Sequence, residues 1–234
     1  MLPPDLTDLI EFHAPLSVVQ RTQGGAVTLL TPGVNVLALN ATFLPGDVAG
    51  RVERVDLRAV QDWHEAQGLP PLVAWAGAAA PAGLGVQRVA QVWVGDWAGE
   101  PEPLDALVRI EQVGRLHLSA WAAALCAAHG TPEWAAGLAR QLAAPLEAAP
   151  RGFTLLMAYR DGQAVGSLLW QARGPGGAAH LWGALDARAG AALLNAAASL
   201  GDGLRVTVPA GWAGLGRHVP VTYGLLAGGH RNPT

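Results

Sequence analysis

Apolar residues alternate with polar ones, or form short runs ended by glycine or proline, through most of the first half of the chain. This pattern is typical of strands, and it predicts them over 26–30, 34–43, 72–75 and 87–95. Leu57, Val60 and Trp63 instead recur at helical spacing, between an aspartate that fits an N-cap, Asp56, and a glycine that fits a C′ position, Gly68. We therefore predict a helix over 57–67 among these strands, after a helical start over 4–12.

The second half predicts a longer and more regular order of elements. In sequence order these are helices over 116–129 and 131–145, strands over 153–159, 163–172 and 178–185, a helix over 187–200, and strands over 204–208 and 219–226. Thr131 is the expected N-cap of the second helix, and Pro145 is the expected end of its regular part. Asp186 is the expected N-cap of the helix that follows the three strands.

Tight turns predict how these three strands pair. Arg160, Asp161 and Gly162 are typical of a hairpin turn, and a second glycine-rich turn covers 174–177, so the strands are expected to be antiparallel. The helix after Leu185 then returns the chain to a strand parallel to the third. Where two neighbouring parallel strands separate, their carboxyl ends and the helix N-terminus form a ligand crevice. The expected fold class is α/β, of the α+β kind, with a mixed and mostly antiparallel sheet flanked by helices.

A polar, proline-rich run divides the two halves. Glu-Pro-Glu-Pro at 100–103 has the composition of a linker between domains. It separates a predicted N-terminal lobe, residues 1–104, from a predicted C-terminal lobe, residues 105–234. Each lobe is expected to have its own sheet.

Composition and charge narrow the classes of protein and partner. The 234 residues are 51% apolar and only 14% charged, whereas about a quarter of the residues of a typical soluble domain are charged. Such a chain buries a core and does not stay disordered, and the scarcity of surface charge favours a homodimer. The net charge of -3 and the lack of a basic cluster argue against nucleic acid as a partner.

Membrane, metal and hydrolase functions find no support in the sequence. Cys126 is the single cysteine and no basic signal peptide opens the chain, so we expect a cytoplasmic protein. The longest uncharged stretch, 69–86, is broken by proline and glycine, so no membrane span is expected. The seven histidines lack metal-ligand spacing, and no Gly-x-Ser-x-Gly elbow is present.

The order of elements in the second half resembles that of the GNAT superfamily of acetyl-CoA-dependent N-acetyltransferases. FTLLMAYRDGQAVGSLLWQARGPGGAAHLWGAL is similar to the family's strand, Asp-Gly turn and two further strands, and VPAGWAGLGRHVPVTYGLLAGG to its closing segment. In the first half, LNATF, VQDWHEAQGLPPLVAW and GLGVQRVAQVWVGDW resemble a degenerate lobe that precedes the catalytic one in longer bacterial members. The resemblance implies two GNAT-like lobes over nearly the whole chain.

The resemblance also implies a place for acetyl-CoA. In the family, its diphosphate rests on backbone amides of a glycine-containing loop at the start of the crossover helix. The corresponding segment here is short and lacks the glycine pattern, and Asp186 brings a carboxylate to the helix end. By resemblance, Arg188 would face the phosphates, and the pantetheine arm would be held by the backbone of Gly183, Ala184 and Leu185.

Two residues are candidates for catalysis. The family's tyrosine acid aligns with Pro220, which leaves Tyr223 as the nearest phenol. His180 is expected opposite Gln171 across the turn, beside Trp182, where it would line a small-molecule pocket and act as a base. A half-buried sheet face with ordinary hydrogen bonds explains the same residues, and both interpretations stay open.

Two functions follow from these observations. The first is an acyl-CoA-dependent N-acyltransferase with weak or altered activity, in which His180 and Tyr223 are the catalytic residues. The second is a catalytically inactive GNAT-derived module that binds a small molecule or a protein partner. The family favours the first, whereas the short loop, Asp186 and Pro220 favour the second.

Overall fold

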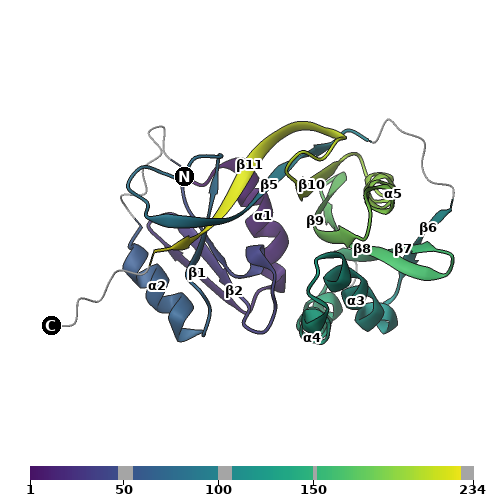
Figure 1. Cartoon of the computed structure of the whole chain (residues 1–234), viewed down its shortest axis with the longest axis horizontal. Coiled ribbons are helices and arrows are strands. Elements are labelled where there is room, and N and C mark those ends of the chain that lie inside the picture. Colours follow the sequence, from purple (N-terminus) through teal and green to yellow (C-terminus); the bar gives the residue numbers. More distant parts are fainter. Residues whose placement is uncertain (47–54, 100–106, 150–151, 228–234) are drawn as a thin grey trace. The chain divides into compact units, whose positions relative to one another are not determined.

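The computed structural model describes residues 1–46, 55–99, 107–149 and 152–227. The chain forms two compact units (Figure 1), of which the first consists of Met1–Pro32, Val36–Val92 and Val219–Thr234, and the second of Gly33–Asn35 and Trp93–His218. Strands β5 (Val86–Trp97) and β11 (Leu215–Leu226) contribute residues to both units. The lobe boundary predicted at 104 and 105 and the predicted linker at 100–103 lie outside the described residues, so both stay predictions.

The first unit contains two α-helices and a mixed sheet. The helices are α1 (Pro4–His13) and α2 (Leu57–Ala66), and the strands are β1 (Val19–Gln23), β2 (Ala26–Leu30), β3 (Ala41–Phe43) and β4 (Leu72–Ala76). Together with β11 and β5, they follow the order β1-β2-β3-β4-β11-β5. β3 and β4 are parallel, with α2 between them in the sequence. The Asp56 carboxylate accepts hydrogen bonds from the amides of Arg58 and Ala59, which confirms the predicted N-cap of α2.

Two strand predictions for the first unit fail. The segment 34–43 is not one strand, because it forms a 3-10 turn, Leu37–Leu39, before the short strand β3. Asn40 sits at this break, and its side-chain oxygen accepts a hydrogen bond from the amide of Thr31, just after β2. β1 is absent from the predicted strands because its residues are polar and mostly exposed, so they show no apolar alternation.

The second unit contains the predicted antiparallel strands and crossover helix. These are β7 (Phe153–Arg160), β8 (Gln163–Arg173), β9 (Gly176–Ala184), α5 (Ala187–Ala198) and β10 (Leu204–Pro209). β7, β8 and β9 are antiparallel, whereas β10 is parallel to β9. The strand order is β5-β10-β9-β8-β7-β6, with β6 (Val108–Val113) at the end. The mixed, mostly antiparallel sheet flanked by helices is therefore confirmed.

Helices cover both faces of the part of the sheet that belongs to the second unit. The Ser167 hydroxyl of β8 donates a hydrogen bond to the Trp121 carbonyl in helix α3 (Leu118–Ala128), whereas the next residue, Leu168, packs in the core with Leu194 of α5. Since successive strand residues point to opposite faces, α3 and α5 lie on opposite faces of the sheet. Helix α4 (Ala135–Ala148) packs beside α3, as Figure 1 shows.

Two details of the α3–α4 segment differ from the sequence prediction. The Thr131 side chain does not cap a helix, because its hydroxyl donates to the Cys126 carbonyl and the 3-10 turn Pro132–Trp134 precedes α4. Pro145 does not end α4, which continues to Ala148. Pro145 stands in the last turn of α4, where its nitrogen cannot donate to the carbonyl four residues earlier.

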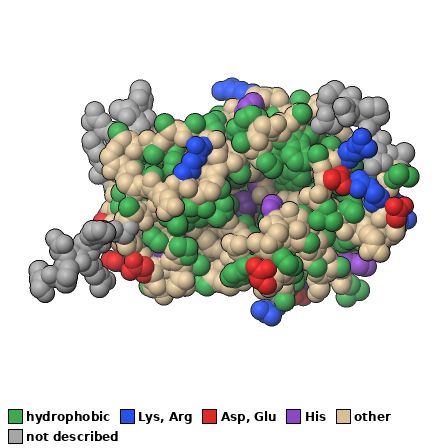
Figure 2. Space-filling model, in the orientation of Figure 1, with side chains coloured by type: hydrophobic (Ala, Val, Ile, Leu, Met, Phe, Trp, Pro, Cys, Tyr) green, Lys and Arg blue, Asp and Glu red, His purple; other side chains and the backbone are tan. Residues whose placement is uncertain are grey.

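Charged side chains are few and scattered on the face of the molecule shown in Figure 2, with apolar and uncharged atoms between them. Some large apolar side chains are exposed, among them Val18, Leu107, Leu116 and Leu185. No helix in the described parts of the chain is long and apolar enough to cross a membrane. The homodimer expected from the low surface charge stays a prediction.

Candidate functional site at the β9–β10 crossover

The parallel strands β9 and β10 separate where the sequence predicts a crevice. They pair from Gly177 to Ala179 on β9 and from Leu204 to Val206 on β10, and both strands continue beyond these residues. The helix α5 begins after the end of β9, as expected for a crossover unit. The carboxyl ends of two diverging strands and a helix N-terminus therefore meet at one place, the site at which α/β folds bind ligands.

Two side chains of β9 bridge this divergence. The His180 Nδ1 atom lies 2.8 Å from the Thr207 hydroxyl, and the Trp182 indole N–H donates to the Thr207 carbonyl at 2.6 Å. Both His180 and Trp182 are 8% exposed. The space between the strands is thus spanned by the chain's own hydrogen bonds, which satisfy buried polar groups of β10.

A second tryptophan, in the loop after β10, packs at the same divergence of β9 and β10. The Trp212 ring meets the Trp182 ring edge-on, with 5.4 Å between centroids and an angle of 90°. Both rings also lie against Gly190 of α5, where an added Cβ would come within 2.9 Å of Trp212 and 3.1 Å of Trp182. The two indoles fill the space beside Gly190. Their packing explains why this position has no side chain, and no bound phosphate is needed to explain it.

The N-terminus of α5 carries a carboxylate cap. The Asp186 side chain accepts a hydrogen bond from the amide of Ala189 at 2.9 Å, and it pairs with the Arg160 guanidinium of β7 at 2.6 and 3.3 Å. This guanidinium is the main reason that the pKa of Asp186 lies below its usual value; partial burial opposes the shift, and the amides of Ala189 and Arg188 reinforce it. The positive end of the helix is thus already compensated by an ionised side chain.

These residues do not fit the diphosphate of CoA. An anion at a helix N-terminus needs free amides, and the Ala189 amide of the first turn bonds to Asp186. A diphosphate placed there would also face the Asp186 carboxylate, which its ion pair with Arg160 keeps ionised. A short turn capped by Asp186 joins β9 to α5, and the predicted loss of the phosphate loop stays a prediction.

The remaining predicted cofactor residues lie together at this turn. Gly183 is buried against the His129 ring, and its absent side chain leaves room for that ring. Ala184 ends β9, and the amide of Leu185 donates to the Val165 carbonyl of β8 at 2.8 Å. Arg188 is exposed in the first turn of α5. Their assigned role in cofactor binding stays a prediction.

The two predicted catalytic residues belong to different units. His180 lies in the second unit, and Gln171 faces Ala178 instead of His180, because the turn is tighter than predicted and pairs Arg173 with Gly176. Tyr223 lies in the first unit, where its side chain is 3% exposed and burial raises its pKa. The raised pKa disfavours an ionised phenol, although the catalytic role itself stays a prediction.

Sequence reasoning missed three residues of this site, Arg160, Thr207 and Trp212. The sequence predicts Arg160 only as part of a hairpin turn. The available signal was Asp186 itself, because a half-buried carboxylate usually has a basic partner.

No cluster of histidine, cysteine or acidic residues able to hold a metal ion occurs in the described ranges.

Replacing Asp186 by alanine is expected to destabilise the second unit by about 1 to 2 kcal/mol, because the N-cap bonds are lost. Asp186→Asn keeps an oxygen for the cap and removes the partly exposed ion pair with Arg160, so its loss should be smaller, about 0.5 kcal/mol. Urea unfolding followed by tryptophan fluorescence measures both changes. Equal stability of wild type and Asp186→Ala would contradict the assignment of the cap.

Comparison with known proteins supports the fold. No family model and no curated protein match the sequence. A GCN5-related N-acetyltransferase from Kribbella flavida has a TM-score of 0.61 at 16% identity, over 99% of this chain and 98% of that chain. A conserved protein of unknown function from Staphylococcus epidermidis has a TM-score of 0.54 at 10% identity, over 90% and 94%.

A third solved structure agrees with the first of these. A GCN5-related N-acetyltransferase from Sphaerobacter thermophilus has a TM-score of 0.52 at 16% identity, and the match covers 87% of this chain and 77% of that chain. At such identities the likeness concerns the fold. Over nearly its whole length, this chain has the fold of the GNAT superfamily of N-acetyltransferases.

Proposed function

We propose that this chain is a GNAT-derived binding module that does not transfer acyl groups from CoA at the β9–β10 crossover. The observation that carries the proposal is the Asp186 carboxylate, which accepts the Ala189 amide at the α5 N-terminus and is paired with Arg160. The indole of Trp182, hydrogen-bonded to Thr207 and packed against Trp212, supports it, because it occupies the divergence between the strands.

Titration of the full chain with acetyl-CoA and with CoA tests this proposal. We expect no saturable heat in calorimetry and a change in melting temperature below about 1 °C at millimolar ligand. A ligand present at a hundred times its Kd would instead add about 2.7 kcal/mol to the free energy of unfolding, which corresponds to a rise of several degrees. Saturable binding that Arg188→Ala weakens would overturn the proposal and support the predicted role of Arg188.

Acyl transfer to an amine is a second candidate function. It is favoured by the match to a GCN5-related N-acetyltransferase over nearly the whole of both chains. The test is the release of free thiol from acetyl-CoA in the presence of mixed primary amines, with the wild type and His180→Ala compared. Release that requires the protein and is lost in His180→Ala would favour this candidate. Release equal to the buffer blank would favour the binding module.

A further inference from the structure

Among the strands that the structure describes, β6 lies at the end of the strand order, with β7 as its neighbour. An edge strand presents a row of backbone donors and acceptors to other chains, and proteins usually blunt such edges. β6 is six residues long, as regular as the strands within the sheet, and contains no proline. Its backbone is therefore suited to pairing with a further strand.

The two faces of β6 differ in character. Val108 and Ile110 pack against the core under α5 and fix this face within the unit. On the other face, Arg109 and Glu111 lie 2.7 Å apart, with side chains that are 74% and 39% exposed. The exposed face of the edge thus carries one positive and one negative charge at neighbouring positions of the same face.

We propose that β6 pairs antiparallel with the β6 strand of a second copy of this chain, with Ile110 at the two-fold axis. This register sets Arg109 of each copy opposite Glu111 of the other, so two pairs of opposite charges form across the new interface. Registers centred on Arg109 or on Glu111 set like charges opposite each other, which is unfavourable. The charge pattern of β6 is therefore complementary to itself in one register.

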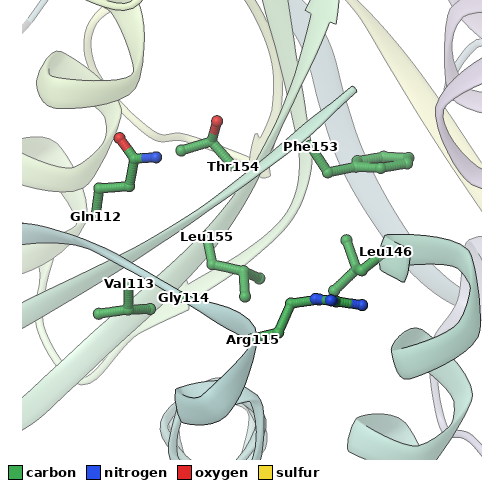
Figure 3. A pocket seen from close by; sticks show the side chains of 8 residues that line it. All are labelled: Gln112, Val113, Gly114, Arg115, Leu146, Phe153, Thr154 and Leu155. Carbon is green, nitrogen blue, oxygen red and sulfur yellow. The ribbon is translucent and has the colours of Figure 1, made fainter. Parts of the chain in front are cut away.

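In the same register, an apolar side chain of the second copy would enter a pocket at the end of β6. This open pocket of about 180 Å³ lies at the end of β6, and its apolar lining comes from Val113, Leu146, Phe153 and Leu155. Figure 3 shows Leu155 between Val113 and Leu146. Leu107, which precedes β6 and is 67% exposed, would stand opposite Val113 of the second copy. Antiparallel pairing thus brings an exposed leucine of each copy to the apolar pocket of the other.

Charge reversal on β6 tests the register. In sedimentation velocity from about 1 to 200 µM, the wild type should dimerise, and Arg109→Glu should raise the dimer Kd roughly tenfold or more. The double variant Arg109→Glu/Glu111→Arg restores opposite charges and should return the Kd to within about threefold of wild type. Arg140→Glu, which makes the same charge reversal at an exposed arginine of α4, is the matched control and should not change the Kd.

Cross-linking gives a second measurement that is specific to the register. Ile110→Cys places two cysteines opposite each other at the axis, within the Cα separation of about 7 Å that a disulfide spans. Gln112→Cys places them about 14 Å apart, and the native Cys126 is buried. Oxidation should therefore cross-link Ile110→Cys and not Gln112→Cys. A wild type that stays monomeric, or a Kd that Arg109→Glu leaves unchanged, would overturn this proposal, which is independent of CoA binding.

Discussion

Trp121→Ala is expected to lower the free energy of unfolding of the second unit by about 3 to 5 kcal/mol. Trp121 is fully buried between α3 and the sheet, and its indole N–H donates to the Leu168 carbonyl of β8 at 3.2 Å. Truncation removes the largest fully buried side chain and leaves a cavity under α3. Urea unfolding at neutral pH measures the loss.

Two further variants separate the contributions to this loss. Trp121→Phe keeps most of the ring volume and removes the hydrogen bond to Leu168, so about 1 to 2 kcal/mol should be lost. Leu116→Ala alters a neighbouring side chain that is 99% exposed and should change stability by less than about 0.5 kcal/mol. If Trp121→Ala cost no more than Leu116→Ala, the packing of α3 on β8 described above would be wrong.

Acidification from about pH 7.5 to about pH 4.5 is expected to lower the stability of the first unit by about 2 to 3 kcal/mol through His64. His64 is fully buried, its Nδ1 atom lies 2.8 Å from the Pro70 carbonyl, and its Nε2 atom lies 3.2 Å from the Thr42 hydroxyl. Burial lowers its pKa from 6.5 to about 4, against the opposing effect of the Pro70 carbonyl.

The direction of this pH effect depends on whether the unfolded or the folded state binds a proton first as the pH falls. As pH falls below 6.5, His64 becomes charged in the unfolded chain and stays neutral in the folded one down to about pH 4. The stabilisation that neutral His64 gives to the folded unit is therefore complete above pH 6.5, and it is lost as the pH falls from 6.5 to about 4. Asp186, whose folded pKa is lowered, loses its contribution only below its ordinary carboxyl range.

Urea unfolding of the wild type and His64→Gln at several pH values checks this prediction. The difference in stability between the two proteins should shrink as pH falls from 6.5 to 4, because glutamine does not titrate. A pH-independent difference would show that folding leaves the pKa of His64 unchanged, which would contradict its burial as a neutral ring.

Helix caps and tight turns were predictable because single residue types determine them. Asp56 and Asp186 both cap the predicted helices, and Asp161 and Gly162 both have the positive φ that a tight hairpin turn requires. These features depend on local chemistry between residues a few positions apart. The sequence therefore predicts them without knowledge of the rest of the fold.

Edge strands and exact registers depend on tertiary surroundings and were not predictable in the same way. β6 escaped prediction because its apolar alternation contains only Val108 and Ile110 before Gln112 breaks it, and only its packing under α5 reveals which face is buried. The irregularity between Leu169 and Gln171 shifts the register of β8 against β9. No residue type in β8 marks such a bulge.

The sequence predicted a changed phosphate site, but it did not predict which side chains fill the candidate site. The short segment after Leu185 and the carboxylate of Asp186 already indicated a changed phosphate site. The closure by Trp182 and Trp212 requires two residues from different strands and loops to meet. Such a contact, between residues about thirty positions apart, follows from the parallel pairing of β9 and β10.

The pairing of β11 with β4 has a consequence for synthesis of the chain. Val221–Leu225 of β11 lies between strands whose residues are made far earlier, and Tyr223 pairs with Ala74. A nascent chain that has emerged only as far as β10 has no β11, so β4 still presents an open edge. The first unit thus begins to leave the ribosome before the second and is completed after it, so β4 keeps an open edge until β11 has emerged.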